Sequence, residues 1–197
     1  ENLLARDDLP MAMRQALLSK LSRTLAGFVT ERQWLGPQHA EYAAREACEK
    51  ATLALAAETP YEEVGELVQH LRRSGQLTAG MLLRGLLSGN VVLFEEAMAE
   101  LSQLSIDRVT GLVHDKNLTG LRALYLKAEL PDVAYPAFRA ALTALREGVL
   151  VGEAGGASRL KRRMVERVLD LCAAEPCDTA LFSLLRRFAV EAAREEA

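Results

Sequence analysis

Apolar positions recur every three or four residues along nearly the whole chain, which is the period of amphipathic helices. No stretch alternates apolar and polar residues in the two-residue period of a strand. Glycine, proline and capping residues interrupt the pattern every 12–23 residues or so. This predicts an all-α fold of about ten short helices, either a helical bundle or an array of HEAT-like helical hairpins. The expected helices cover residues 8–34, 38–58, 59–75, 78–89, 90–102, 105–114, 119–131, 132 or 135–147, 158–174 and 178–196.

The first two expected helices differ in the size of their apolar side chains. The helix over 8–34 has a stripe of large residues, which we expect to form its core side: Met13, Leu17, Leu21, Leu25 and Phe28. The helix over 38–58 has a stripe made mostly of alanine, with Cys48 and Leu55 among them. Small side chains let another helix approach closely, so we expect these two helices to pack together.

Several polar residues stand where helices are expected to begin. Thr59 and Glu62 have the spacing of a capping box, with Pro60 between them at the expected first helical position. Thr78, Asn90, Ser105 and Thr119 are expected to cap the helices that follow them.

Glycines are densest between the eighth and ninth expected helices, at Gly148, Gly152, Gly155 and Gly156. Such a stretch predicts a mobile joint. We therefore expect a main domain over 1–147, a joint over 148–157 and a C-terminal helical hairpin over 158–197. The last helix has an apolar stripe, including Phe188, that is too wide for one neighbouring helix to cover. The hairpin is expected to pack on the main domain or on a second copy of the chain in a homodimer.

Composition and charge narrow the class of protein. Half of the residues are hydrophobic, while the mean hydropathy is only +0.02, which excludes a disordered tail. No apolar run approaches the roughly 18 residues of a membrane-spanning helix, so no membrane role is expected. The net charge of −3 argues against a protein that coats nucleic acid. Three cysteines without zinc-type spacing suit a reducing cytoplasm, and the start at Glu1 without methionine or leader suggests a fragment of a longer protein.

The chemical motifs of enzymes and metal sites are missing from the sequence. The three histidines, His39, His70 and His114, have no second histidine or cysteine three or four residues away. Cys172 and Cys177 are five residues apart across an expected turn. There is no nucleophile elbow, phosphate-binding loop or dinucleotide fingerprint. We therefore expect no catalytic residue, no cofactor and no metal.

Two segments are candidates for binding a partner. Residues 94–115 place apolar side chains where a helix-turn-helix needs them, but Gln103 stands where glycine is usual, and the expected reading helix has only Asp107 and Arg108 as charges. The basic stretch 159–167 forms the polar side of an amphipathic helix. It could dock an acidic protein through Arg159, Arg162 and Arg163, or form a solvated side in which Arg162 pairs with Glu166.

A set of leucine, alanine and glycine patterns resembles a bacterial family catalogued as domain of unknown function 2336. These patterns include residues 77–95, 120–125, 136–139, 160–163 and 187–189, with Leu9, Pro10 and Trp34 near the start. The resemblance implies an all-helical fold and transfers no catalytic residue, and it suggests the C-terminal part of a longer protein. We expect a non-catalytic protein-interaction or regulatory module with an unidentified protein partner. The alternative is a nucleic-acid-binding regulator that uses 94–115 or 159–167.

Overall fold

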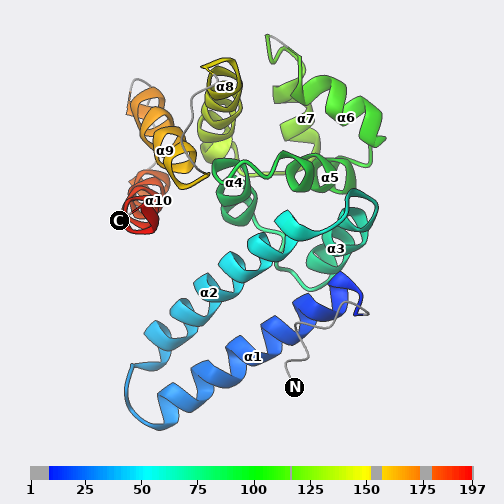
Figure 1. The fold of residues 1–197 in the computed structure, drawn as a ribbon. Helices are drawn as coiled ribbons and strands as arrows, with labels where there is room; N and C mark the ends of the chain where they lie inside the picture. The colour runs from blue at the N-terminus through cyan, green and yellow to red at the C-terminus, as the bar shows by residue number, and fades with distance from the viewer. Residues whose placement is uncertain (1–8, 116, 152–156, 174–178, 197) are drawn as a thin grey trace. The chain divides into compact units, whose positions relative to one another are not determined.

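The computed structural model of the chain describes residues 9–115, 117–151, 157–173 and 179–196, and its regular elements are all helices (Figure 1). Side chains are described for 9–115, 117–147, 161–172 and 182–194. These residues form ten α-helices and one short 3-10 helix, with no strand among them. The predicted all-α fold of about ten helices is confirmed.

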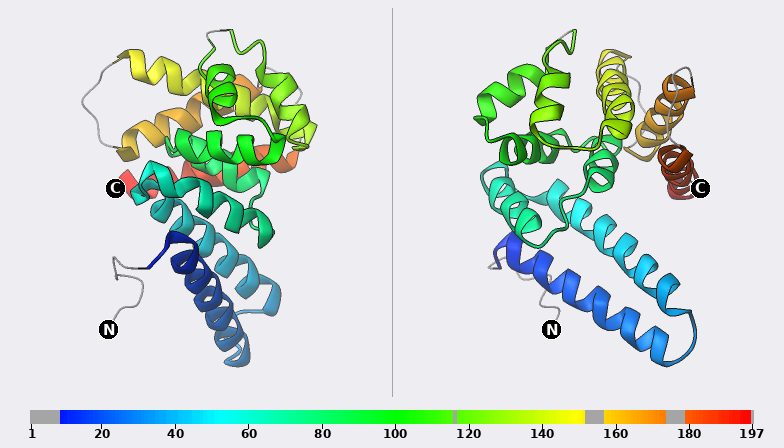
Figure 2. Two further views of the ribbon diagram at one scale, coloured as in Figure 1. Left: turned by 90° about the vertical axis from the view of Figure 1, so that its right-hand side faces the viewer. Right: turned by 180° about the vertical axis from the view of Figure 1, so that it is seen from behind.

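The chain divides into two compact units, Glu1–Ser74 and Gly75–Ala197. The first unit contains α1 (Met11–Glu31), α2 (Pro37–Glu58) and α3 (Tyr61–Arg73). Helices α1 and α2 run side by side as an antiparallel hairpin (Figure 2), and α3 packs on α1. The division into 1–147, 148–157 and 158–197 stays a prediction, because residues 152–156 of the expected joint lie outside the described residues.

Polar and small side chains line the contact between α1 and α2. Ser19 Oγ lies 3.5 Å from Cys48 Sγ, and the amide of Gln15 donates a hydrogen bond to Ser19 Oγ at 3.0 Å. Both Gln15 and Ser19 are buried. These short side chains, facing the cysteine and alanines of α2, allow the two helices to approach closely.

The expected core stripe of the first helix is wrong. Met13, Leu21, Leu25 and Phe28 are exposed, and Leu17 is only half-buried. Residues 15 and 19 lie on a different side of α1 from this stripe, and it is their side that contacts α2. An apolar period identifies a helix but does not identify the surface that covers it.

Several helices begin at the predicted residues, but not all of those residues form the predicted capping hydrogen bond. The hydroxyl of Thr78 accepts from the backbone amide of Met81, and the side chain of Asn90 accepts from Leu93, both at 3.2 Å, so these two caps are confirmed. Ser105 occupies its predicted position without a capping side-chain bond.

Two predicted caps are wrong. The hydroxyl of Thr59 donates to the carbonyl of Leu55 at 2.7 Å, so it closes α2 and does not form a capping box with Glu62. Thr119 donates to Asp115 at 2.7 Å, and α7 begins two residues later without a side-chain cap.

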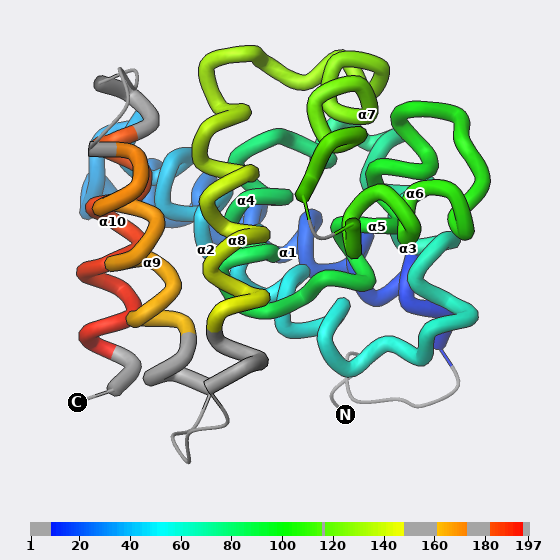
Figure 3. The backbone as a smooth tube through the Cα atoms, turned by 90° about the horizontal axis from the view of Figure 1, so that it is seen from above, coloured from blue at the N-terminus to red at the C-terminus, as the bar shows by residue number. Residues whose placement is uncertain are grey.

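The second unit holds the remaining helices. They are α4 (Ala79–Leu87), α5 (Val91–Ser102), α6 (Ile106–Val113), α7 (Leu121–Lys127), the 3-10 helix η2 (Asp132–Ala134), α8 (Tyr135–Val151), α9 (Ala157–Ala173) and α10 (Thr179–Glu196). Helices α8, α9 and α10 follow one another side by side, while α5, α6 and α7 form a second group (Figure 3). Helix α4 packs against both α5 and α8 and joins the two groups.

Aromatic side chains link the helices of this unit. The rings of Phe94 and Phe138 are stacked at 5.7 Å, and Tyr125 lies 5.4 Å from Phe138. All three residues are buried. The phenol of Tyr125 donates to the carbonyl of Pro131 at 2.8 Å, which satisfies the polar end of an otherwise apolar side chain.

The C-terminal helix α10 packs on α4 through one ion pair and one ring. Arg84 Nη1 lies 3.0 Å from Glu191 Oε2, and the guanidinium of Arg84 lies 4.5 Å from the ring centre of Phe188. Phe188 is 2% exposed. Leu185 and Ala192 are also buried. This part of the apolar stripe of α10 therefore packs inside the second unit.

Candidate functional site

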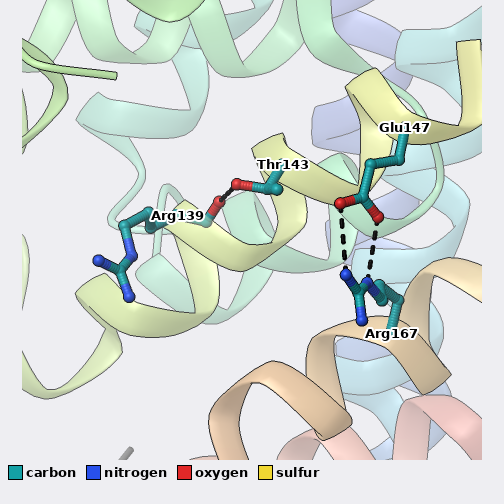
Figure 4. A network of polar contacts seen from close by, with 4 residues as sticks. All are labelled: Arg139, Thr143, Glu147 and Arg167. Atoms are coloured by element: carbon teal, nitrogen blue, oxygen red, sulfur yellow. Dashed lines mark hydrogen bonds and ion pairs between the residues drawn. The ribbon is translucent and has the colours of Figure 1, made fainter. Parts of the chain in front are cut away.

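Two arginines of the basic helix α9 form ion pairs with neighbouring glutamates. Arg162 Nε lies 2.9 Å from Glu166 Oε1 one turn away. Arg167 reaches α8, where its Nε lies 3.1 Å from Glu147 Oε2 and its Nη2 lies 3.3 Å from Glu147 Oε1 (Figure 4). This hydrogen-bonded carboxylate raises the pKa of Arg167 above its usual range. Neighbouring acids thus offset two of the arginines on the polar side of this helix.

The three arginines predicted to bind a partner differ in how far the structure describes them and in their contacts. Arg162 is exposed but paired with Glu166. Arg163 is exposed on the same helix. The side chain of Arg159 lies outside the described residues. The structure therefore places two of the three on one exposed side of α9.

The turn between α5 and α6 shares one feature with a helix-turn-helix. Its first residue, Gln103, has φ 56° and takes the left-handed conformation that glycine usually supplies at such a turn. Val109 is buried, while Leu104 and Leu112 are half-buried, as packing positions of the motif should be. The exposed residues of α6 are Asp107, Arg108 and Gly111, so one arginine is its whole cationic surface.

A buried carboxylate joins α5 to the end of α6. Glu95 Oε1 lies 2.8 Å from His114 Nε2, and Thr110 donates to Glu95 Oε2 at 3.0 Å. In an acyl-transfer triad the base stands between nucleophile and carboxylate, whereas here the carboxylate stands between the other two groups. The arrangement of Glu95, Thr110 and His114 is therefore that of a polar contact linking α5 to α6. Sequence reasoning missed it because 19 residues separate Glu95 from His114.

The side chains that most often carry metals and nucleophilic chemistry are dispersed. Over the described part of the chain, no group of three histidine, cysteine or acidic residues could hold a metal ion. Cys48 and Cys172 are both buried, where the reactive thiolate form is disfavoured. Cys177 lies outside the described residues.

Helix α1 and the turn after it expose several large apolar side chains in the first unit. Leu21 and Leu25 are 57% and 58% exposed. Phe28 and Trp34 continue this surface toward the turn, with ring centres 5.8 Å apart in an edge-to-face contact, and Trp34 is 66% exposed. We call Leu21, Leu25, Phe28 and Trp34 the α1 apolar face. Contiguous exposed apolar side chains of this size mark interaction surfaces on many proteins.

The sequence matches a protein-family model over most of its length. A family model described as an uncharacterised protein conserved in bacteria (DUF2336) matches residues 1–177. The chain belongs to the DUF2336 family. The resemblance expected from the leucine, alanine and glycine patterns is thereby confirmed. The DUF2336 match includes the α1 apolar face and ends before α10.

Comparisons with curated proteins and with solved structures find no match. Within the described residues of this DUF2336 chain, no helix combines the length and apolar character needed to cross a membrane.

Proposed function

We propose that this DUF2336 chain is a non-catalytic protein-interaction or regulatory module whose contact surface is the α1 apolar face. The observation that carries the proposal is that leucines and aromatic rings are exposed along one side of α1, while Gln15 and Ser19 are buried at its contact with α2. Burying a large apolar side chain contributes about 1.5–3 kcal/mol. The α1–α2 hairpin does not bury these side chains itself. A partner that covers them would therefore bind with a favourable hydrophobic contribution.

The polar side of α9 is a weaker candidate for the same role. An acidic partner attracted to Arg162 would have to compete with Glu166, which already lies 2.9 Å away. Exposed ion pairs contribute little in water. We therefore assign the protein partner to α1 and regard Arg159, Arg162 and Arg163 as a secondary surface.

Nucleic-acid binding is the second candidate, because Gln103 takes the left-handed conformation that the turn of a helix-turn-helix requires. Its chemistry disfavours it. Phosphate anchoring needs several lysines or arginines, whereas the described surface of α6 has Arg108 beside Asp107. Retention on DNA that falls steeply with salt would support this alternative.

The experiment that tests the proposal compares two variants as bait in a pull-down from a bacterial lysate. One variant, Leu21→Glu with Leu25→Glu, puts two carboxylates on the α1 apolar face. The matched control, Ala16→Glu with Lys20→Glu, puts two carboxylates at the same spacing on another, already exposed side of α1. A captured protein is then purified and its binding measured directly.

We expect binding to be lost in the leucine variant and kept in the control. Equal binding by both variants would contradict the assignment of the contact to α1. Retention on DNA without any protein partner would favour the nucleic-acid alternative.

A further inference from the structure

The two sides of the α1–α2 hairpin differ in chemistry. The contact line between the helices runs through Ser19 and Cys48. With 3.6 residues per turn, Leu21, Leu25 and Phe28 of α1 lie on one side of this line. The exposed alanines Ala43, Ala47 and Ala54 of α2 lie on that same side. The other side carries the charged residues Lys20, Arg23 and Arg45, while Lys50 lies at the outer edge of the alanine side.

The apolar side places large residues beside small ones at the same height. Ser19 lies opposite Cys48, and in an antiparallel pair each step along α1 corresponds to one step back along α2. Leu21 is therefore level with Ala47 to within one residue, and Leu25 is level with Ala43. The hairpin thus presents a ridge of leucines next to a furrow of alanines.

This surface is complementary to itself. A second hairpin turned half a revolution about an axis parallel to the helices places its α1 over the first α2, antiparallel to it. Leu21 of one copy then falls over Ala47 of the other, and Leu25 falls over Ala43. Large residues facing small ones fill an interface without gaps. A twofold axis repeats each contact, so both ridges fit both furrows.

The area is sufficient for a specific dimer. Leu21, Leu25, Phe28, Trp34 and Leu35 are each between 43% and 66% exposed. At about 200 Å² for a large side chain, they present roughly 500 Å² per copy, to which the alanines of α2 add. Two copies together bury roughly 1,000 Å², the size expected of a biological interface of modest affinity.

We infer that the occupant of the α1 apolar face is the same face of a second copy, which forms a four-helix bundle from two α1–α2 hairpins. The inference rests on the proposed function, because it names the partner of the same surface. The central part of this face, formed by Leu21, Leu25, Ala43 and Ala47, carries no charge, and Arg32 stands at its end with its guanidinium 5.0 Å from the ring centre of Phe28. The hairpin itself supplies a partner whose ridges and furrows match this central part.

Sedimentation velocity of the purified chain over 1–200 µM, in order of magnitude the range for an interface of this size, tests the inference. We expect a monomer–dimer equilibrium for the parent. Leu21→Glu with Leu25→Glu should weaken dimerisation by at least about 30-fold, because two carboxylates would be buried without partners. The control, Ala16→Glu with Lys20→Glu, should leave dimerisation within about threefold, since exposed charges contribute little. Circular dichroism checks that both variants keep the helix content of the parent.

Disulfide cross-linking tests the predicted register. Two chains of different tag size, one with Leu21→Cys and the other with Ala47→Cys, are mixed and oxidised in a background carrying Cys177→Ser. We expect a cross-linked heterodimer, with at least about tenfold less product when either chain is oxidised alone, because only the mixed pair brings the two positions together in this arrangement. Equal yields in the mixed and single samples would overturn the register.

The self-association inference and the proposed function can fail separately. A parent that stays monomeric over the whole range overturns the inference, while capture of a protein that depends on Leu21 and Leu25 would still support the proposed function. A dimer that the leucine variant leaves intact overturns the inference as well. Capture that the leucine variant also leaves intact overturns the proposed assignment of the contact surface.

Discussion

Removal of the Glu191 carboxylate is expected to destabilise the second unit strongly. Glu191 of α10 pairs with Arg84 of α4 at 3.0 Å, and their side chains are only 14% and 8% exposed. The two residues are 107 positions apart in the sequence. Glu191→Ala would therefore leave a buried guanidinium without its carboxylate and test whether α10 is an integral part of the second unit.

The size of the effect follows from the surroundings of Arg84. Breaking a buried ion pair by removing one partner typically costs about 3–5 kcal/mol. The guanidinium also lies 4.5 Å from the ring centre of Phe188, and that cation–π contact, about 1 kcal/mol, survives the change. We expect Glu191→Ala to lower the free energy of unfolding by about 2–4 kcal/mol, a large part of the roughly 5–15 kcal/mol of a typical domain.

Urea unfolding followed by circular dichroism measures the loss, and hydrogen exchange of α4 and α10 amides reports on the second unit alone. Glu166→Ala is the matched control, since it removes the exposed partner of Arg162 and should cost less than about 0.5 kcal/mol. Arg84→Met combined with Glu191→Leu should recover most of the loss, because apolar pairs often replace buried ion pairs at little cost. A loss for Glu191→Ala of less than about 0.5 kcal/mol, no larger than that of the control, would refute the reasoning.

Three further substitutions have definite expected outcomes. Phe188→Ala removes a ring that is 2% exposed and should cost about 3–5 kcal/mol in the same urea assay. Tyr125→Phe deletes the hydrogen bond to the carbonyl of Pro131 and should cost about 1 kcal/mol; no loss of stability would mean that water replaces the phenol. Burial, with a smaller contribution from Glu95, raises the pKa of Glu96. The native state then holds this proton more tightly than the unfolded chain, and stability falls as pH rises through the two pKa values. Glu96→Gln should therefore stabilise the chain at pH 7 by less than about 1 kcal/mol after solvent screening. Thermal unfolding measures this gain, which should disappear near pH 3. An equal gain at both pH values would contradict the raised pKa of Glu96.

Local signals were enough to predict most of the helices. The periodic pattern and the residues Thr78 and Asn90 depend only on neighbours within one turn, and the structure confirms both caps. Thr59 has the same local signature but bonds back to Leu55 in the preceding helix. A threonine hydroxyl can satisfy either helix, and spacing alone does not decide between them.

The contacts that join distant helices could not be predicted from spacing. Glu95 contacts His114 and Arg84 contacts Glu191, and each pair depends on how separate helices cross. The polar side of α9 shows the intermediate case. The pair Arg162–Glu166 lies within one helix and was foreseen as an alternative, whereas the pair of Arg167 with Glu147 needs the packing of α9 on α8.

The misassigned stripe of α1 has a physical explanation that bears on function. In an isolated helical hairpin the hydrophobic effect favours leucines at the contact and polar residues outside. Helices α1 and α2 do the opposite, with Gln15 and Ser19 buried beside Cys48 and with Leu21 and Leu25 exposed. Part of this polar contact is hydrogen-bonded internally, since Gln15 donates to Ser19 and Ser19 lies at hydrogen-bonding distance from Cys48. Because polar residues occupy the contact with α2, Leu21 and Leu25 remain on the outside of the hairpin. Burying them against a partner would contribute favourable free energy to binding. Burial of the polar residues and exposure of the leucines explain why the sequence pattern predicts the wrong core side of α1. The same placement gives α1 the exposed apolar side chains that the proposed binding requires.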